Sequence, residues 1–307
     1  MKVTNNTTKP VTQPNNDRKK NFKTAALAYA AGAAADNSIT TAYNLTINNA
    51  IARLIATAPE PALNIPAKLQ TALENSKLKN TELIDIAKFN SVSQNAQLKK
   101  TAEFIEKEYK NHPFSKIIAN CDNPLIKNFL QKKYNTIAYL LKEGKNAIYL
   151  MTTNKILINS EKAGFAGFHE IGHAMNRHLS HSGRFLQTIR VPSAMAASII
   201  PTVALLTNKR TDNNPPENFW QKTTAFIKEN VGKLTAIAFV PILTEEAMAS
   251  VKGQKLAKSV LPKTLMKNVT KANLAGFATY IGLALVSGFA AYTGNKLRDK
   301  IVEKRKG

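Results

Sequence analysis

Residues 168–175 read FHEIGHAM, a segment that contains the pattern HExxH over positions 169–173. In a helix, residues i and i+4 lie on one face, so His169 and His173 can present two imidazole nitrogens to one metal ion. Glu170 follows the first of these residues, and its carboxylate can accept a proton from an attacking water and pass it to a leaving amine. The pattern predicts a Zn²⁺ site with His169 and His173 as ligands and Glu170 as the catalytic base.

The same five residues also fit a buried amphipathic helix whose histidines bond to neighbouring groups. Two features around the motif favour the metal site. Apolar residues at 165, 168, 171 and 175 predict a helix buried in a domain. Residues 147–151 and 155–159 flank Thr152-Thr153-Asn154 and predict a β-hairpin just upstream.

The composition limits the kinds of partner. The chain has 307 residues with 43 basic and 20 acidic side chains, a formal charge of +23. Such a balance suits an anionic membrane surface or nucleic acid. Because the lysines are spread along the whole chain, only 7% of residues are aromatic and no binding motif occurs, we expect no nucleic-acid partner. The single cysteine, Cys121, excludes an intramolecular disulfide and is interpreted as a structural thiol.

The segment before the motif is predicted to be mainly helical. Residues 1–22 are rich in Asn, Thr, Lys and Pro and are typical of a disordered basic tail, while 23–58 could form a membrane or amphipathic helix. Residues 59–190 are predicted to form a helical catalytic region that carries the hairpin and the HExxH helix. Its expected helices cover residues 69–78, 81–91, 96–109 and 124–141.

Two uncharged runs follow the motif. Residues 191–208 and 272–295 contain 18 and 24 residues without a charge, enough to cross a hydrocarbon core of ~30 Å. Residues 191–244 are therefore predicted to form a transmembrane hairpin, 245–271 a helix with the third ligand, 272–295 a transmembrane segment and 296–307 a basic tail. Buried, alanine-rich soluble helices are the alternative, which the negative mean hydropathy favours.

A zinc peptidase site needs a third protein ligand. The metzincin continuation fails, because Asn176 and Leu179 stand where Gly and His belong. Glu245 and Glu246 end an apolar run, where an unpaired carboxylate would be costly. We predict Glu246 as the ligand and Ser250, four residues on, as the hydroxyl beside a ligating histidine. Glu245 points about 100° away and is expected to be structural or at the rim. A pair of solvated acids at a helix N-terminus is the alternative.

At this point the chain resembles the membrane-integral gluzincins, namely HtpX-like proteases, CAAX prenyl proteases and related neutral zinc metallopeptidases. The resemblance rests on HEIGH, an apolar hairpin and Glu-x-x-Ala-Ser at 246–250, and it covers about residues 145–295. It implies that His169, His173 and Glu246 bind zinc and that Glu170 is the base. Ser250 takes a place often held by Asp. The resemblance also implies that substrate lies extended along the 147–159 hairpin.

We therefore expect a mainly α fold: a zincin-like helical catalytic core with a short β-hairpin, plus transmembrane helices. The predicted function is a membrane-integral zinc endopeptidase that cleaves peptide or membrane-protein substrates, with the lipid bilayer as its other partner. Segment 59–190 has a larger excess of cations than loop 209–233, which places the site on the cytoplasmic side. Proton-donor candidates are His178, His181 and Tyr149. The alternatives are a basic membrane-associated scaffold and a metal-binding protein without peptidase activity.

Overall fold

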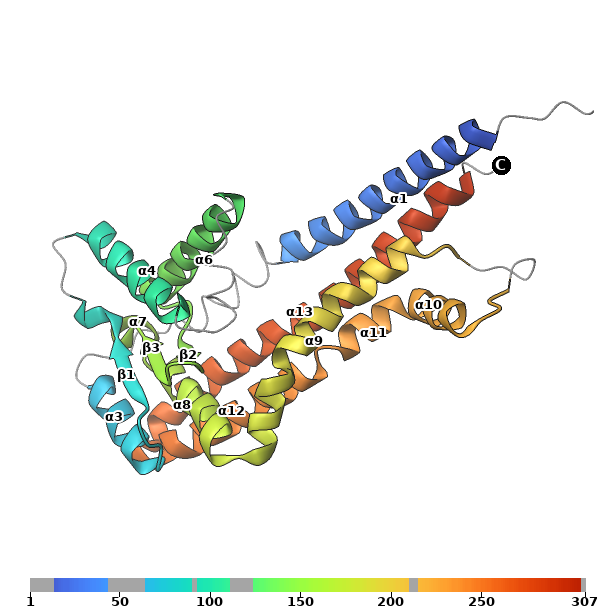
Figure 1. Cartoon of the computed structure of the whole chain (residues 1–307). Coiled ribbons are helices and arrows are strands. Elements are labelled where there is room, and N and C mark those ends of the chain that lie inside the picture. The colour runs from blue at the N-terminus through green and yellow to red at the C-terminus, as the bar shows by residue number, and fades with distance from the viewer. Residues whose placement is uncertain (1–13, 44–63, 90–92, 111–123, 210–214, 305–307) are drawn as a thin grey trace, which may run out of the picture. The chain divides into compact units, whose positions relative to one another are not determined.

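A computed structural model of the chain describes residues 14–43, 64–89, 93–110, 124–209 and 215–304 (Figure 1). The chain divides into two compact units. The larger unit, Thr41–Ala196 with Ala236–Leu285, contains the HExxH motif, and the smaller comprises Met1–Thr40, Ala197–Thr235 and Val286–Gly307. The fold is mainly helical, as predicted. Cys121 lies outside the described residues.

A three-stranded sheet lies in the larger unit, with β3 between β1 and β2 (Figure 1). The predicted hairpin is present: β2 (Ile148–Leu150) runs antiparallel to β3 (Lys155–Ile158). The third strand, β1 (Glu82–Asp85), pairs parallel with β3. A helix over residues 81–91 was therefore a wrong prediction, because residues 82–85 form this strand and a 3-10 helix (η3, Ile86–Lys88) follows. A short apolar run fits the period of a helix and that of a strand equally well. Here the pairing with β3 makes residues 82–85 a strand.

The remaining predicted helices of the larger unit are present. They are α3 (Ile65–Asn75), α4 (Gln94–Lys110) and α6 (Pro124–Lys142). A short helix, α7 (Ser160–Ala163), connects β3 to the helix that carries the motif. Side chains from α3, β3 and the motif helix share one core, which includes Leu69, Ile156, Ile158, Phe168 and Ile171. A second core lies between α4, α6 and the sheet, so the strands are packed on both faces.

The motif lies on α8 (Ala166–Leu179), which packs antiparallel against α12 (Val240–Val260). The contact is made through glycines. A Cβ on Gly172 would collide with the carbonyl of Ala249, and a Cβ on Gly253 would collide with the carbonyl of Phe168. Asn176 continues the register by donating to the main-chain oxygen of Glu245 at 3.2 Å. Without side chains at these two glycines, the backbones approach closely and the acid-bearing helix is held beside the histidines.

Three helical segments of the described chain are long and apolar enough to cross a membrane. They are α9 (His181–Leu206), the segment Val231–Val260 formed by α11 (Val231–Ile237) and α12, and α13 (Lys263–Lys304). Only 28%, 33% and 28% of their most apolar windows is buried, which does not fit the alternative of buried soluble helices. The expected boundaries at 244/245, 271/272 and 295/296 lie inside α12 and α13, which run through them without interruption.

The smaller unit contains most of α1 (Pro14–Tyr43) and all of α10 (Phe219–Glu229). Residues 14–22, expected in a disordered tail, form the start of α1, and the first 13 residues lie outside the described part. Gly32 of α1 meets Gly294 of α13, again with no room for a Cβ on either glycine. Of the expected helix at 23–58, the structure describes residues up to 43, and α1 is not among the three candidate spans.

Candidate metal centre

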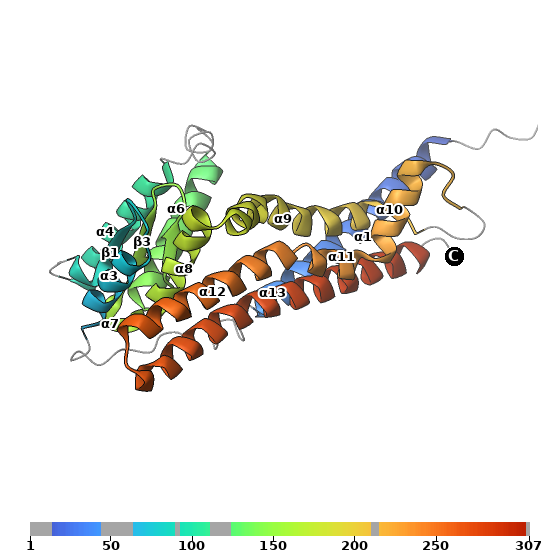
Figure 2. The same ribbon diagram turned by 90° about the horizontal axis from the view of Figure 1, so that it is seen from below.

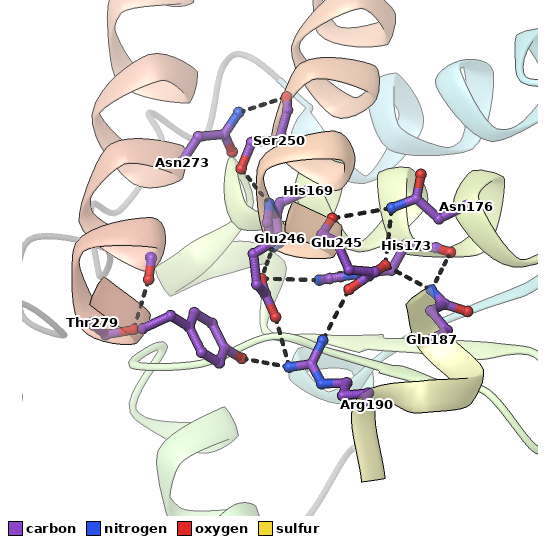
Figure 3. Close-up of polar contacts among 12 residues, drawn as sticks. His169, His173, Asn176, Gln187, Arg190, Glu245, Glu246, Ser250, Asn273 and Thr279 are labelled. Atoms are coloured by element: carbon purple, nitrogen blue, oxygen red, sulfur yellow. Dashed lines mark hydrogen bonds and ion pairs between the residues drawn. The ribbon is translucent and has the colours of Figure 1, made fainter. Parts of the chain in front are cut away.

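Three side chains from two helices converge on one point. Glu246 Oε2 lies 3.1 Å from His169 Nε2 and 3.4 Å from His173 Nε2 (Figure 3). The three ligand atoms lie within 4.8 Å of one another and could hold a metal ion. The carboxylate oxygen of Glu246 is therefore close enough to both imidazole nitrogens for one ion to contact all three. Two imidazoles and one carboxylate are also a donor set that zinc accepts.

The contacts of His173 show that this point requires a cation. Its Nδ1 lies 2.9 Å from Glu245 Oε1, while its Nε2 faces Glu246 Oε2. A neutral imidazole has one N–H, so one nitrogen would turn a lone pair toward a carboxylate oxygen. Burial alone lowers the pKa of His173, but the charges and hydrogen bonds of Glu246 and Glu245 raise it well above its usual value. A proton or a metal ion is therefore favoured between His173 and Glu246, and metal binding must release that proton.

Each histidine has an outer partner of its own. Ser250 Oγ lies 3.1 Å from His169 Nδ1, the contact expected from its i+4 spacing to Glu246. The Ser250 carbonyl in turn accepts a hydrogen bond of 3.2 Å from Asn273 Nδ2 on α13. Glu245 accepts from His173 on the other side. Such outer contacts fix the tautomer and the orientation of a ligating imidazole, and they leave Nε2 free for the metal.

Glu245 was expected to be structural or at the rim of the site. The position at the rim is a wrong prediction, because the residue is fully buried. Its side chain is 0% exposed and its carboxylate accepts four hydrogen bonds. Oε1 accepts from His173 Nδ1, Asn176 Nδ2 (2.9 Å) and Gln187 Nε2 (2.8 Å), and Oε2 accepts from Arg190 Nη1 (2.9 Å) (Figure 3). This residue therefore joins α8, α9 and α12 at the centre of the site.

Arg190 was not predicted as a site residue. It lies directly before the uncharged run 191–208. In the structure its guanidinium bridges Glu245 and Glu246, with Nη2 2.6 Å from Glu246 Oε1 and 3.1 Å from the Tyr280 hydroxyl (Figure 3). Two carboxylates and one guanidinium leave one net negative charge, which a divalent ion beside two neutral imidazoles complements.

The three candidate ligands, His169, His173 and Glu246, line a cavity of about 430 Å³. Glu170, which is 8% exposed, lines the same cavity. The strand β2 and the two residues before it form one border through residues 146–149, and α13 forms another through Gly276 and Tyr280. The cavity therefore brings together the three candidate metal ligands, a further carboxylate and the free edge of the sheet.

The three proton-donor candidates lie in different places. Tyr149 lines the cavity, and its hydroxyl lies 3.1 Å from His178 Nε2 and 3.0 Å from Asn154 Oδ1. Burial raises the pKa of Tyr149 to about 12, so its hydroxyl stays protonated near neutral pH. His178 is exposed, and desolvation with Arg177 and Arg184 lowers its pKa. His181 begins α9 after the break at Ser180 and is not among the residues that line the cavity.

Comparison with known proteins adds nothing to this picture. No protein-family model matches the chain, and no curated protein or solved structure is significantly similar to it.

Proposed function

We propose that the protein is a membrane-integral zinc endopeptidase of the gluzincin type. The observation that carries the proposal is the convergence of His169, His173 and Glu246 beside Glu170 on one cavity. His169 Nε2, His173 Nε2 and Glu246 Oε2 would hold the ion. When bound, zinc would polarise the scissile carbonyl and make water acidic enough to attack at neutral pH.

The protein's own groups supply the other requirements of peptide hydrolysis. Glu170 accepts the proton of the attacking water and gives it to the leaving amine. Glu245 and Ser250 keep the two imidazoles in the tautomer that directs Nε2 inward. Tyr149 and Tyr280 line the cavity, and a phenol that turns its hydroxyl group from its present partner could donate to a developing oxyanion.

The sheet suggests how a substrate would be held. β3 is paired on both sides, whereas β2 pairs only with β3 among the described strands, and residues next to it line the cavity. An extended peptide that adds to the free edge of β2 would pass the metal ligands with its main chain fixed by hydrogen bonds. Recognition through the main chain suits an endopeptidase acting on unfolded segments of peptides or membrane proteins. The charge difference between segments 59–190 and 209–233 favours a site on the cytoplasmic side.

The proposal is tested with the full chain purified in detergent. Zinc content and cleavage of casein are measured for wild type, Glu170→Gln and Glu246→Ala, with the exposed Glu229→Gln as matched control. We expect one zinc per wild-type chain, retained in Glu170→Gln with loss of cleavage, and lost in Glu246→Ala. A Glu170→Gln protein that cleaves as fast as wild type refutes the catalytic assignment. Zinc binding without cleavage by any variant leaves a metal-binding protein and refutes the peptidase.

A further inference from the structure

The helix α10 exposes three large aromatic side chains. Phe219, Trp220 and Phe226 are 72%, 74% and 57% exposed. Phe219 and Phe226 are seven residues apart and lie on the same face of the helix, and Trp220 flanks them. In a soluble protein such a patch would be costly, so it indicates a surface that another apolar phase covers.

The opposite face of α10 is fixed to the unit by a polar cluster. Lys228 is nine residues from Phe219, which places it about 180° around the helix. Its Nζ, on a side chain that is 4% exposed, donates to the Ala204 carbonyl at 3.1 Å and to Asn295 Oδ1 at 2.7 Å and pairs with Asp299 at 2.8 Å. Buried in this way, Lys228 orients the helix so that its aromatic residues point away from the unit.

These contacts also determine where α10 lies along the candidate membrane spans. Ala204 belongs to the last turn of α9, and Arg298 donates to the next carbonyl, that of Leu205, at 3.0 Å. Asn295 ends the uncharged run of α13, and α11 begins two residues after α10. All three candidate spans therefore change from apolar to polar where α10 is attached. Within this unit, Figure 2 shows α10 lying across the direction of α13 rather than along it.

We infer that α10 is an interfacial anchor, which lies in the headgroup region of a bilayer with Phe219, Trp220 and Phe226 against the acyl chains. An amphipathic helix parallel to the surface, with aromatic residues at the boundary, is the usual form of such an anchor. Among the described residues of the same unit, the exposed cations outnumber the exposed acids. The cations are Lys23, Lys209, Lys222, Lys233, Lys296, Lys300 and Lys304, and the acids are Glu217, Glu229 and Glu303. The expected lipid is therefore anionic.

The sequence provides a probe, because Trp220 is the only tryptophan. The unmodified full chain is reconstituted in phosphatidylcholine–phosphatidylglycerol vesicles that carry bromine at a shallow or a deep position of the acyl chains. We expect quenching of Trp220 fluorescence to be stronger with shallow bromine. We also expect brominated phosphatidylglycerol to quench more than brominated phosphatidylcholine at equal mole fraction. A conservative control, Thr223→Ser, should leave both results unchanged, whereas Phe219→Ser/Phe226→Ser should weaken the shallow quenching.

Three results overturn the inference. Stronger quenching by deep bromine would place Trp220 inside the hydrocarbon core. The absence of quenching at either depth would show that water, another protein or a second copy of the chain covers the patch. Equal quenching by the two lipids would remove the anionic preference. Because the inference rests on the proposed membrane location, flotation with the vesicles is measured in parallel. Failure to float refutes that location, whereas flotation without quenching refutes the anchor alone.

Discussion

Replacing Glu245 by Gln should weaken zinc binding although Glu245 is not a ligand. In wild type, Oε1 accepts three hydrogen bonds and Oε2 accepts one from Arg190. The amide of Gln can keep an oxygen at only one of these two positions. The less costly choice keeps the oxygen beside His173 and turns the NH₂ toward the guanidinium of Arg190, so that two donors face each other.

The magnitude follows from this single conflict. The lost bond involves two ionised groups, and such hydrogen bonds contribute about 1.5–3 kcal/mol. Part of that free energy holds His173 in its orientation and holds Arg190 against Glu246. Its loss should therefore weaken metal binding. An outer-shell substitution of this kind costs about 10–100-fold in metal affinity, or about 1.4–2.8 kcal/mol. The loss should remain smaller than that of Glu246→Gln, which removes a ligand itself.

The assay is competition for zinc between the full chain in detergent and a chromophoric chelator. Near-ultraviolet circular dichroism checks that the Glu245→Gln protein is folded, and Ser250→Ala tests the outer partner of the other histidine in the same way. If folded Glu245→Gln bound zinc as tightly as wild type, the contact of 2.9 Å between Glu245 and His173 would not orient the ligand, and the reasoning would be refuted.

Three further predictions concern packing, metal and pH. Gly172→Ala should lower the free energy of unfolding by about 1–3 kcal/mol, because the new methyl group meets the Ala249 carbonyl. Gly276→Ala is its matched control in denaturant titration, since nothing lies within 4 Å of the added Cβ, and an equal loss would contradict the packing argument. Chelator treatment should remove the proposed metal ion and lower the Tm reversibly, since a ligand at about 100 times its Kd stabilises the native state by about 2.7 kcal/mol. An unchanged Tm would show that the site does not bind metal tightly. Burial raises the pKa of Tyr149 from 10.0 to about 12, so the native state holds this proton more tightly than the unfolded state. Stability should therefore be lost as the pH rises from 10 to 12, and Tm measured against pH should fall less steeply in Tyr149→Phe.

The sequence predicted those parts of the site whose chemistry is local. Two histidines at i and i+4 with an intervening glutamate specify one helix face, and an acid pair after an apolar run needs a cation nearby. The hairpin at 147–159 could be found for the same reason, because two short apolar runs and the turn between them lie within 13 residues. These inferences needed no knowledge of how distant segments pack.

The missed features depend on distant contacts. Residues 82–85 form a strand because they pair with β3 about 70 residues later, and nothing in their own pattern selects this over a helix. Arg190 lies between two plausible roles, a membrane-boundary charge and a site residue, and only the packing of α9 beside α12 selects the second. The central position of Glu245 likewise requires Asn176 and Gln187 to be brought to the same carboxylate by two other helices.

The glycine contacts between α8 and α12 have a consequence for the register of the two helices. Gly172 on α8 lies against the main chain of Ala249, and Gly253 on α12 lies against the main chain of Phe168. At each glycine, the main chain of the other helix occupies the space that a side chain would take. Sliding α12 by one helical turn would move Glu246 about 5.4 Å along α8, farther than a carboxylate can reach back to both imidazoles. The two glycines therefore fix the register of α8 and α12 to within a fraction of a helical turn, and this register determines which acid faces the histidines.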